Sequence, residues 1–480
     1  MFKRTIKGLM LGGLCCVCAF SWAAEPLTKD EAAAALRRAA VFFRNEVAVN
    51  GGYLWKYGAD LALREGEGKA DKFTAWVQPP GTPSVGSAYL DVYERTGDDF
   101  YLETAREAAE ALIQGQLRSG GWSYRISFDP AVRPRYAYRV DAGNERGDNT
   151  STLDDDTTQS ALRFLMRVDK ALAFKDEPLH EAVLFGLRSL LEAQYPNGAW
   201  PQRFTGPPDP AKFPVKQASY PETWPRTWPG EDYSRYYTFN DNTISDTIET
   251  MFAAFDTYGN EAYRAAAEKA GDFMLLAQMP DPQPGWAQQY NADMQPAWAR
   301  KFEPPAITGG ESQGVMRALL CVYRRTGNAK YLEPFPRALA YYRPSLLPDG
   351  RIARFYELQT NKPLYFTKDY RLTYSDADMP THYGFIGSSW VDAVEKEYNA
   401  LKETPPERLR ETAKEKIYEM SASLAARASD IAAHLDERGA WVEKKGLGYH
   451  DPNDKTTPVI DCQTFAQNIR VLSEFIAASK

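Results

Sequence analysis

Apolar residues recur along the chain at helical spacing, in segments separated by short polar turns. Near residue 240, for example, Ile244, Ile248, Met251 and Phe255 lie at positions i, i+4, i+7 and i+11, which places them on one face of a helix. The turns, such as RTGDD and TYGNE, contain glycine and are typical of connections between antiparallel helices. The pattern therefore predicts a succession of helix pairs.

These helix pairs form a repeat in which each unit ends at a corner of glycine followed by an aromatic or apolar residue. The corners are Gly121-Trp122, Gly198-Ala199-Trp200, Gly285-Trp286 and Gly350-Arg351-Ile352, and partial units at the two ends of the chain have Trp55 and Trp441 at theirs. Such self-similarity is typical of architectures in which neighbouring units stack. Because the end units resemble halves, we expect closure into a ring rather than an open solenoid. The predicted fold is all-α: an α/α toroid, or incomplete α/α barrel of repeated helix pairs, with long loops and short strands lining a groove.

One long loop, residues 205–237, interrupts the repeat and exceeds the usual length of a connection in a compact domain. It contains seven prolines and several aromatic residues. Prolines reduce the freedom of the unfolded chain and aromatic rings can pack, so we expect an ordered wall of the groove. Trp224 and Trp228 have no counterpart in the repeat and are therefore candidates for contact with a ligand.

The first residues have the pattern of a secretory signal peptide. Three basic residues among the first seven precede an apolar run (9–20) and the small residues Ser21 and Ala23. We expect cleavage after Ala23, which leaves residues 24–480 as a single domain in the periplasm or outside the cell. No later stretch reaches about 18 uninterrupted apolar residues, so we expect no membrane insertion.

Composition narrows the possible functions. The formal net charge of −7 argues against broad nucleic-acid binding, which needs a basic surface, and four histidines leave little room for a histidine-built zinc site. After removal of the signal peptide only Cys321 and Cys462 remain, so disulfides do not hold the fold together. Cys321 lies in an apolar run, which predicts a buried thiol. The 28 tyrosines and 11 tryptophans exceed what a core requires, and such rings often line surfaces that bind sugars.

Two acidic clusters precede helices at equivalent points of neighbouring units: residues 154–156 (Asp-Asp-Asp) and 240–242 (Asn-Asp-Asn). Helix N-caps favour these residue types, but one side chain is enough to cap a helix. Three consecutive aspartates repel one another unless a cation lies among them. Ligands that offer only oxygen suit Ca²⁺. Spacing alone leaves both interpretations open, capping and a calcium site.

Arg300 and Arg354 follow the glycine corners of the third and fourth units, on the side predicted for the groove. An arginine on a surface is usually solvated or paired with a nearby glutamate. Facing an acidic metal cluster, however, guanidinium groups and a divalent cation would converge on an anionic ligand.

Five segments carry a resemblance to a known family: STLDDDTTQSALRFLMRV, LEAQYPNGAWPQRF, YYTFNDNTI, GWAQQYNADMQPAWARKFEPPAITGGES and RIARFYELQTNKP. They resemble the pectate lyases of polysaccharide lyase family ten, between about residue 30 and about residue 390. The resemblance implies a calcium-dependent α/α toroid that cleaves polygalacturonate, an anionic polysaccharide, by β-elimination.

The resemblance also implies roles for individual residues. Asp154 and Asp241 match calcium-binding aspartates, and Asp155, where many members have asparagine, stays plausible as a third ligand. Arg300 matches the arginine that acts as the base. The expected substrate contacts are Arg354, which matches a substrate-binding arginine, Lys368, which replaces a further one, and Lys301, Asn242, Trp224 and Trp228. Lysine keeps the charge of arginine but loses its two-pronged hydrogen bonding.

The chemistry of a uronate agrees with this assignment, because its C5 proton is acidic and Ca²⁺ would stabilise the charge that develops on the adjacent carboxylate. Arginine is normally protonated, so Arg300 would need neighbouring cations that depress its pKa. Two other functions stay open. One is a toroidal glycoside hydrolase that uses Asp241 with Glu303 or Glu311 as paired carboxylates. The other is a secreted glycan-binding protein without catalysis. We expect a monomer in each case.

Overall fold

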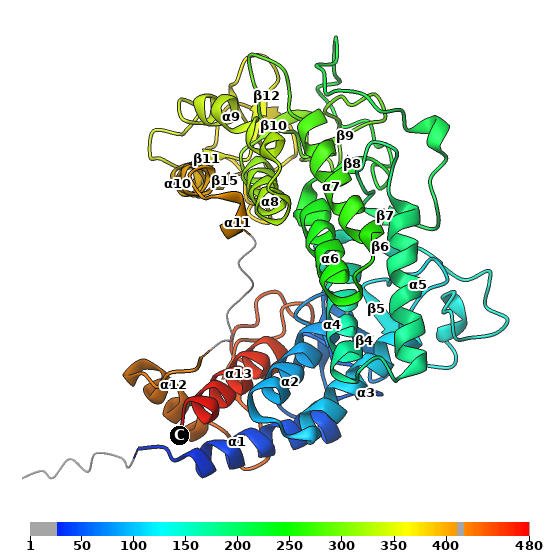
Figure 1. The fold of residues 1–480 in the computed structure, drawn as a ribbon, viewed down its shortest axis with the longest axis vertical. Helices are drawn as coiled ribbons and strands as arrows, with labels where there is room; N and C mark the ends of the chain where they lie inside the picture. The colour runs from blue at the N-terminus through cyan, green and yellow to red at the C-terminus, as the bar shows by residue number, and fades with distance from the viewer. Residues whose placement is uncertain (1–25, 410–416, 480) are drawn as a thin grey trace, which may run out of the picture.

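The computed structural model describes residues 26–409 and 417–479, so the predicted signal peptide lies outside the described residues. Helices dominate this part of the chain, and six of them form the inner wall of an arc in which each contacts the next (Figure 1). In spatial order they are α13 (Cys462–Ala478), α2 (Thr82–Thr96), α4 (Thr157–Ala171), α6 (Thr243–Tyr258), α8 (Gly310–Thr326) and α10 (Val391–Lys402). The outer helices are α1 (Lys29–Phe42), α3 (Asp99–Gly115), α5 (Glu177–Ala193), α7 (Glu261–Leu276), α9 (Phe335–Tyr342) and α12 (Ala422–Ala433).

The turns between paired helices repeat the same local chemistry. Helices α2, α6 and α8 each end at a glycine in the left-handed conformation, with φ of 70°, 68° and 72°. The residue directly after the glycine then caps the following helix: Asp98, Asn260 and Asn328 each accept a hydrogen bond from a backbone N–H two residues further on. Glycine at the helix end and Asp or Asn at the next start are the residues that this geometry favours. The predicted helix pairs are confirmed.

The corner tryptophans hold each unit together. The indole N–H groups of Trp122, Trp200 and Trp286 each donate to a backbone carbonyl of the preceding helix, at 2.8 Å, and all three side chains are fully buried. Trp441 makes the same contact with Ile431. Trp55 differs, because its indole bonds instead to the carbonyl of Gln78 in the next loop. Four of the five corner tryptophans therefore have the same structural role.

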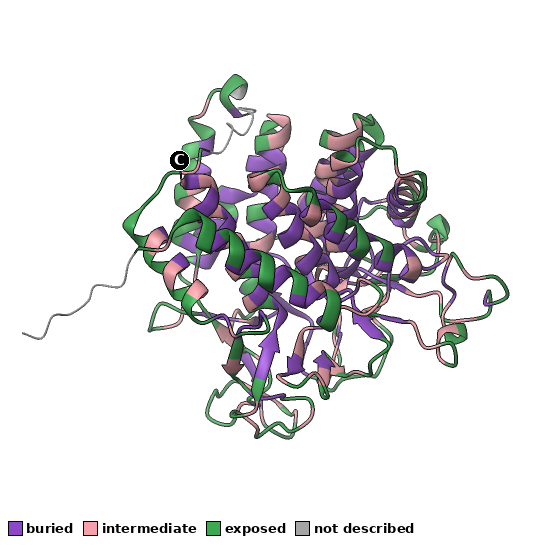
Figure 2. Cartoon of the chain, turned by 90° about the horizontal axis from the view of Figure 1, so that it is seen from below, coloured by how far each residue is buried: buried purple, intermediate pink, exposed green. Residues whose placement is uncertain are grey.

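Short antiparallel strands and long loops gather at one end of the helices, as Figure 2 shows. Strand pairs link successive units: β4 (Thr74–Trp76) with β5 (Arg125–Ser127), β6 (Ser151–Thr152) with β7 (Arg203–Phe204), and β8 (Tyr237–Thr238) with β9 (Gln289–Tyr290). A sheet in the order β10-β12-β13-β14 comprises Ala306–Thr308, Phe355–Glu357, Pro363–Phe366 and Leu372–Thr373, and β11 (Ile352–Ala353) pairs with β15 (Ile386–Gly387). The largest sheet has the order β16-β17-β1-β2-β3, with the ranges Val442–Lys444, Pro458–Asp461, Lys56–Gly58, Arg64–Gly66 and Gly68–Lys69. These strands form the rim at which the acidic clusters lie.

The two ends of the chain meet, since α1 packs against α12 and α13. The partial units at the termini thus combine, as the ring hypothesis requires. Figure 1 nevertheless shows the arc open between α10 and α12, so the fold is the expected incomplete α/α barrel and the expectation of a closed ring is wrong. None of the described helices has the length and apolar character needed to cross a bilayer.

The two cysteines of the described chain are both free, which agrees with a fold that does not depend on disulfides. Cys462 is fully buried at the start of α13. Cys321, on α8, is partly exposed and lines a cavity between α6 and α8. The prediction of a buried thiol at Cys321 is therefore wrong, because the small residues of α8 leave space on this face.

Candidate functional site

The two acidic clusters form identical turns in front of α4 and α6. The turns are the short helices η3 (Asp154–Asp156) and η5 (Asn240–Asn242). In each, the second and third residues are left-handed, with φ of 48° and 59° in η3 and 47° and 58° in η5. Asp and Asn tolerate this conformation better than other residues with a side chain. Asp155 and Asp241 therefore occupy equivalent positions in neighbouring units.

These turns do not cap the helices that follow. The residues at the N-cap positions of α4 and α6, Asp156 and Asn242, make no capping hydrogen bond with their side chains. Asp156 instead pairs with Arg163, with the carboxylate oxygen and guanidinium nitrogen 2.5 Å apart. Capping, the alternative that spacing left open, is therefore not the role of the acidic side chains.

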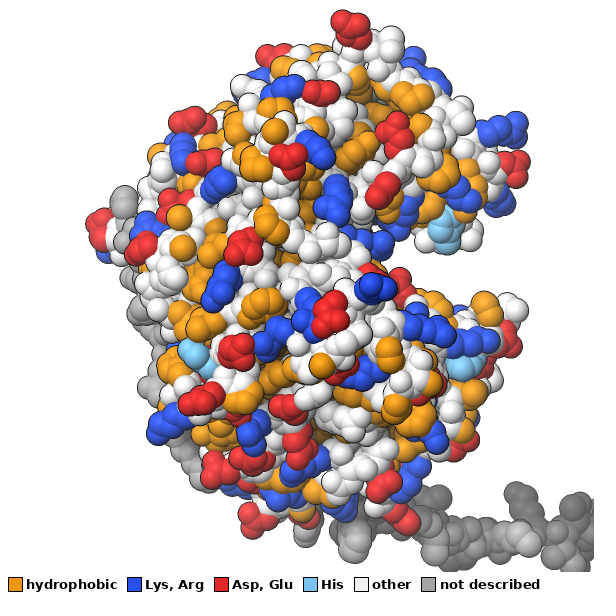
Figure 3. All heavy atoms as spheres, turned by 90° about the vertical axis from the view of Figure 1, so that its right-hand side faces the viewer, with side chains coloured by type: hydrophobic (Ala, Val, Ile, Leu, Met, Phe, Trp, Pro, Cys, Tyr) orange, Lys and Arg blue, Asp and Glu red, His pale blue; other side chains and the backbone are white. Residues whose placement is uncertain are grey.

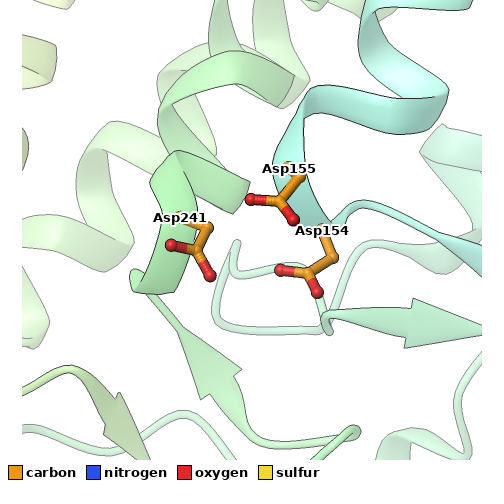
Figure 4. A group of neighbouring side chains, drawn as sticks. All are labelled: Asp154, Asp155 and Asp241. Carbon is orange, nitrogen blue, oxygen red and sulfur yellow. The ribbon is translucent and has the colours of Figure 1, made fainter. Parts of the chain in front are cut away.

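Three carboxylates converge between the turns (Figure 4). Asp154, Asp155 and Asp241 each offer an oxygen, and these atoms lie within 4.8 Å of one another. Asp154 accepts a hydrogen bond of 2.6 Å from the Tyr124 hydroxyl, and Asp155 one of 2.8 Å from the Gln78 amide. The other oxygen of Asp154 is buried without a hydrogen-bond partner, and none of the three forms an ion pair with any described residue.

The cluster holds its protons unusually tightly. Burial and the nearby charges of Asp154 and Glu67 raise the pKa of Asp155 to about 6. Burial and the two neighbouring aspartates raise the pKa of Asp241 to about 7. A bound cation would stabilise the ionised carboxylates, because it would offset their mutual repulsion and coordinate the Asp154 oxygen that has no hydrogen-bond partner. The donor set therefore fits a hard divalent ion such as Ca²⁺.

Arg300 faces this cluster and is held by one carboxylate. Its guanidinium forms two hydrogen bonds with Glu303, from Nε at 2.8 Å and from a terminal nitrogen at 2.5 Å, and its backbone N–H donates a third. The Glu303 side chain is 1% exposed. Burial favours loss of the guanidinium proton, but the pair with Glu303 outweighs it and raises the pKa of Arg300. The guanidinium is thus firmly protonated in this arrangement.

Arg354 approaches the cluster from the fourth unit. It donates a hydrogen bond of 2.6 Å to Glu311, and its charge, like that of Arg300, stabilises ionised Asp241. Both arginines lie against the ring of Tyr383, with the guanidinium carbon of Arg354 at 4.4 Å and that of Arg300 at 5.5 Å from its centre. The Tyr383 hydroxyl also donates to Glu303 at 2.8 Å. Tyr383 thereby fixes the spacing of the two arginines.

Sequence reasoning did not find Tyr383, Tyr124 or Gln78. Tyr383 lies in a stretch that departs from the family resemblance, and no local pattern marks it. Glu303, by contrast, follows Arg300 by three positions in the same loop, and this short spacing was a signal for the ion pair.

The predicted substrate contacts do not all line the same cavity. Asn242 lines a cavity together with Asp241 and Arg354. Trp228 lines a second cavity with Trp298 and Tyr370 and donates its indole N–H to the carbonyl of Ala299, next to Arg300.

The remaining three predicted contacts, like Trp228, do not line the cavity that contains Asp241. Lys301 stacks on Tyr370, with its ammonium 3.6 Å from the ring centre. Trp224 of the long loop packs near Trp298, with the two ring centres 6.3 Å apart. Lys368 is 66% exposed, lines neither cavity and lies 3.4 Å from Asp378, so the structure does not bring it to the cluster.

A family model described as pectic acid lyase matches residues 130–326, a range that contains all three aspartates and Arg300. The resemblance stated from the sequence is thus confirmed over this range. No curated protein matches the chain.

Similar solved structures include a family 10 polysaccharide lyase from Cellvibrio cellulosa, at 21% identity over 66% of this chain and 97% of that one, with a TM-score of 0.47. A mutant of that lyase in complex with trigalacturonic acid matches at 21% identity over 66% and 98% of the two chains, with a TM-score of 0.46. A cellobiose 2-epimerase from Bacillus thermoamylovorans matches at 14% identity over 93% and 98%, with a TM-score of 0.44.

Proposed function

We propose that the protein is a secreted or periplasmic, monomeric pectate lyase that cleaves polygalacturonate by calcium-dependent β-elimination. The observation that carries the proposal is the unpaired three-aspartate cluster faced by two arginines, within the range that matches the pectic acid lyase model. Figure 3 shows a notch between two lobes with Lys and Arg side chains around it, which suits an anionic polymer.

Asp154, Asp155 and Asp241 would hold Ca²⁺. When bound, the ion supplies a positive charge that stabilises the developing negative charge on a substrate carboxylate. Arg354 binds a carboxylate of the chain and fixes its register, because Glu311 and the ring of Tyr383 hold its guanidinium in place.

Arg300 removes the C5 proton in this mechanism. The C5–H electrons form the double bond between C4 and C5, the bond from C4 to the glycosidic oxygen breaks, and that oxygen takes a proton from water. Because the pair with Glu303 raises the pKa of Arg300, the free base needs alkaline pH and the positive charges of the loaded site. Activity should therefore rise with pH well above neutrality.

The hydrolase alternative agrees less well with the geometry. A general acid needs a raised pKa, but the pair with Arg300 lowers the pKa of Glu303 despite its burial. Glu311 is likewise committed to an arginine. Incubation with polygalacturonate separates the candidates: the lyase yields an unsaturated, ultraviolet-absorbing product, the hydrolase yields reducing ends without absorbance, and a glycan-binding protein yields neither.

A further inference from the structure

A cavity of about 470 Å³ runs along α6 and α8, beside Asp241 and Arg354, and Arg300 does not line it. Its α8 wall includes Gly310, Gly314 and Ala318, one helical turn apart. A Cβ at Gly310 would meet no atom within 4 Å, and one at Gly314 would meet only an Asn242 oxygen at 3.5 Å. Open space therefore continues from the metal cluster along the inner wall of the arc.

Glu311 presents an unsatisfied oxygen in this cavity. One of its carboxylate oxygens binds Arg354, but the other is buried and has no hydrogen-bond partner among the described residues. The side chain is only 7% exposed. An ionised oxygen that is buried without a donor is unfavourable, so it calls for a donor from a bound molecule.

Trp390 and Arg317 also line the cavity, where they place an exposed aromatic ring beside a cation. The indole is 45% exposed, and the Arg317 guanidinium lies 4.1 Å from its ring centre. The backbone N–H of Trp390 donates to the side chain of buried Gln313, which anchors the residue to α8. Arg317 has no ion pair in the described part of the chain, so its N–H groups are available to an anion.

We propose that this cavity is a further subsite for a hexuronate residue of the polysaccharide, next to the residue held at the aspartate cluster. The sugar ring stacks on Trp390, its carboxylate binds Arg317, and a hydroxyl group donates to the free oxygen of Glu311. The proposal rests on the proposed function and extends it, because it makes affinity depend on the length of the bound chain.

Calorimetric titration tests the subsite with calcium present and Arg300→Ala as the background, so that the ligand is not consumed. Trp390→Ala and Arg317→Ala should each weaken hexagalacturonate binding by about 5- to 30-fold, the range of a desolvated cation–π or stacking contact. The affinity for monomeric galacturonate, which cannot span the aspartate cluster and the subsite, should change by less than about 2-fold. Arg324→Ala is the matched control, because Arg324 is on α8, pairs with Glu397 at 2.5 Å and does not line the cavity.

Lyase activity of the wild type distinguishes the two proposals. If the wild type forms unsaturated product but Trp390→Ala and Arg317→Ala bind hexagalacturonate like the control, the subsite is wrong and the proposed function stands. If both variants lose hexagalacturonate affinity while the wild type forms no unsaturated product, the subsite is right and the lyase assignment is wrong. If the wild type neither binds hexagalacturonate nor forms product, both are wrong.

Discussion

The three aspartates of the proposed calcium site should destabilise the protein when no ion is bound, and Asp241→Asn measures this effect. Asp241 has a pKa of about 7 in the folded chain, against about 3.9 in an unfolded one. Because the folded pKa is the higher one, the unfolded state ionises first, and the free energy of unfolding falls as pH rises from about 4 to about 7. The fall reaches ~4 kcal/mol at about 1.4 kcal/mol per pH unit, and solvent screening of the partly open cluster reduces it to ~2 kcal/mol.

Thermal unfolding in chelator at pH 5 and pH 8 tests this reasoning. The wild type should lose about 2–4 °C more in Tm between the two pH values than Asp241→Asn does. Added calcium should restore the wild type at pH 8 and leave Asp241→Asn unchanged. Asp246→Asn is the matched control: burial and the nearby charge of Asp156 raise the pKa of Asp246 to about 7 as well, but it lies outside the cluster. That variant should also be stabilised at pH 8 yet keep its response to calcium. Equal pH dependence of Tm in the wild type and Asp241→Asn would refute the argument.

Three further changes have defined outcomes. Arg300→Lys should lower kcat by at least about 100-fold, because a shorter amine loses the position of the base, and nearly full activity at the alkaline optimum would contradict a guanidine base. Tyr383→Phe removes a hydrogen bond to Glu303 and should shift the pH profile of kcat to higher pH, because Glu303 then pairs more strongly with Arg300 and raises its pKa further; an unchanged profile would show that Tyr383 does not tune Arg300. Trp200→Phe leaves the buried carbonyl of Leu190 unpaired and should cost about 1–3 kcal/mol of unfolding free energy in urea, with kcat preserved in the folded fraction.

The repeat could be predicted from sequence because its signals are local. Helix spacing, glycine at helix ends and Asp or Asn at the next start are all read within a few residues, as in the turns after α2 and α6. The corner tryptophans have the structural role that their place in the repeat predicts, and Trp55 differs only in its partner, the carbonyl of Gln78 in the following loop.

The details of the site could not be predicted in the same way, because they depend on contacts between distant segments. The left-handed turns that align Asp155 with Asp241 follow from neighbouring units packing side by side. The placement of Tyr383 between two arginines requires β11 and β15 to bring residues 353 and 386 together. Lys368 was predicted to contact the substrate from its place in the family resemblance, but its side chain is exposed and pairs with Asp378 instead.

The most direct test of the central claim is the ultraviolet absorbance of unsaturated product during incubation with polygalacturonate at alkaline pH. The account predicts that absorbance rises with added calcium, disappears with chelator and is lost in Asp154→Ala, whose unpaired buried oxygen belongs to the proposed ion site. Product formation that is unaffected by chelator and by this substitution, or release of reducing ends without absorbance, would contradict it.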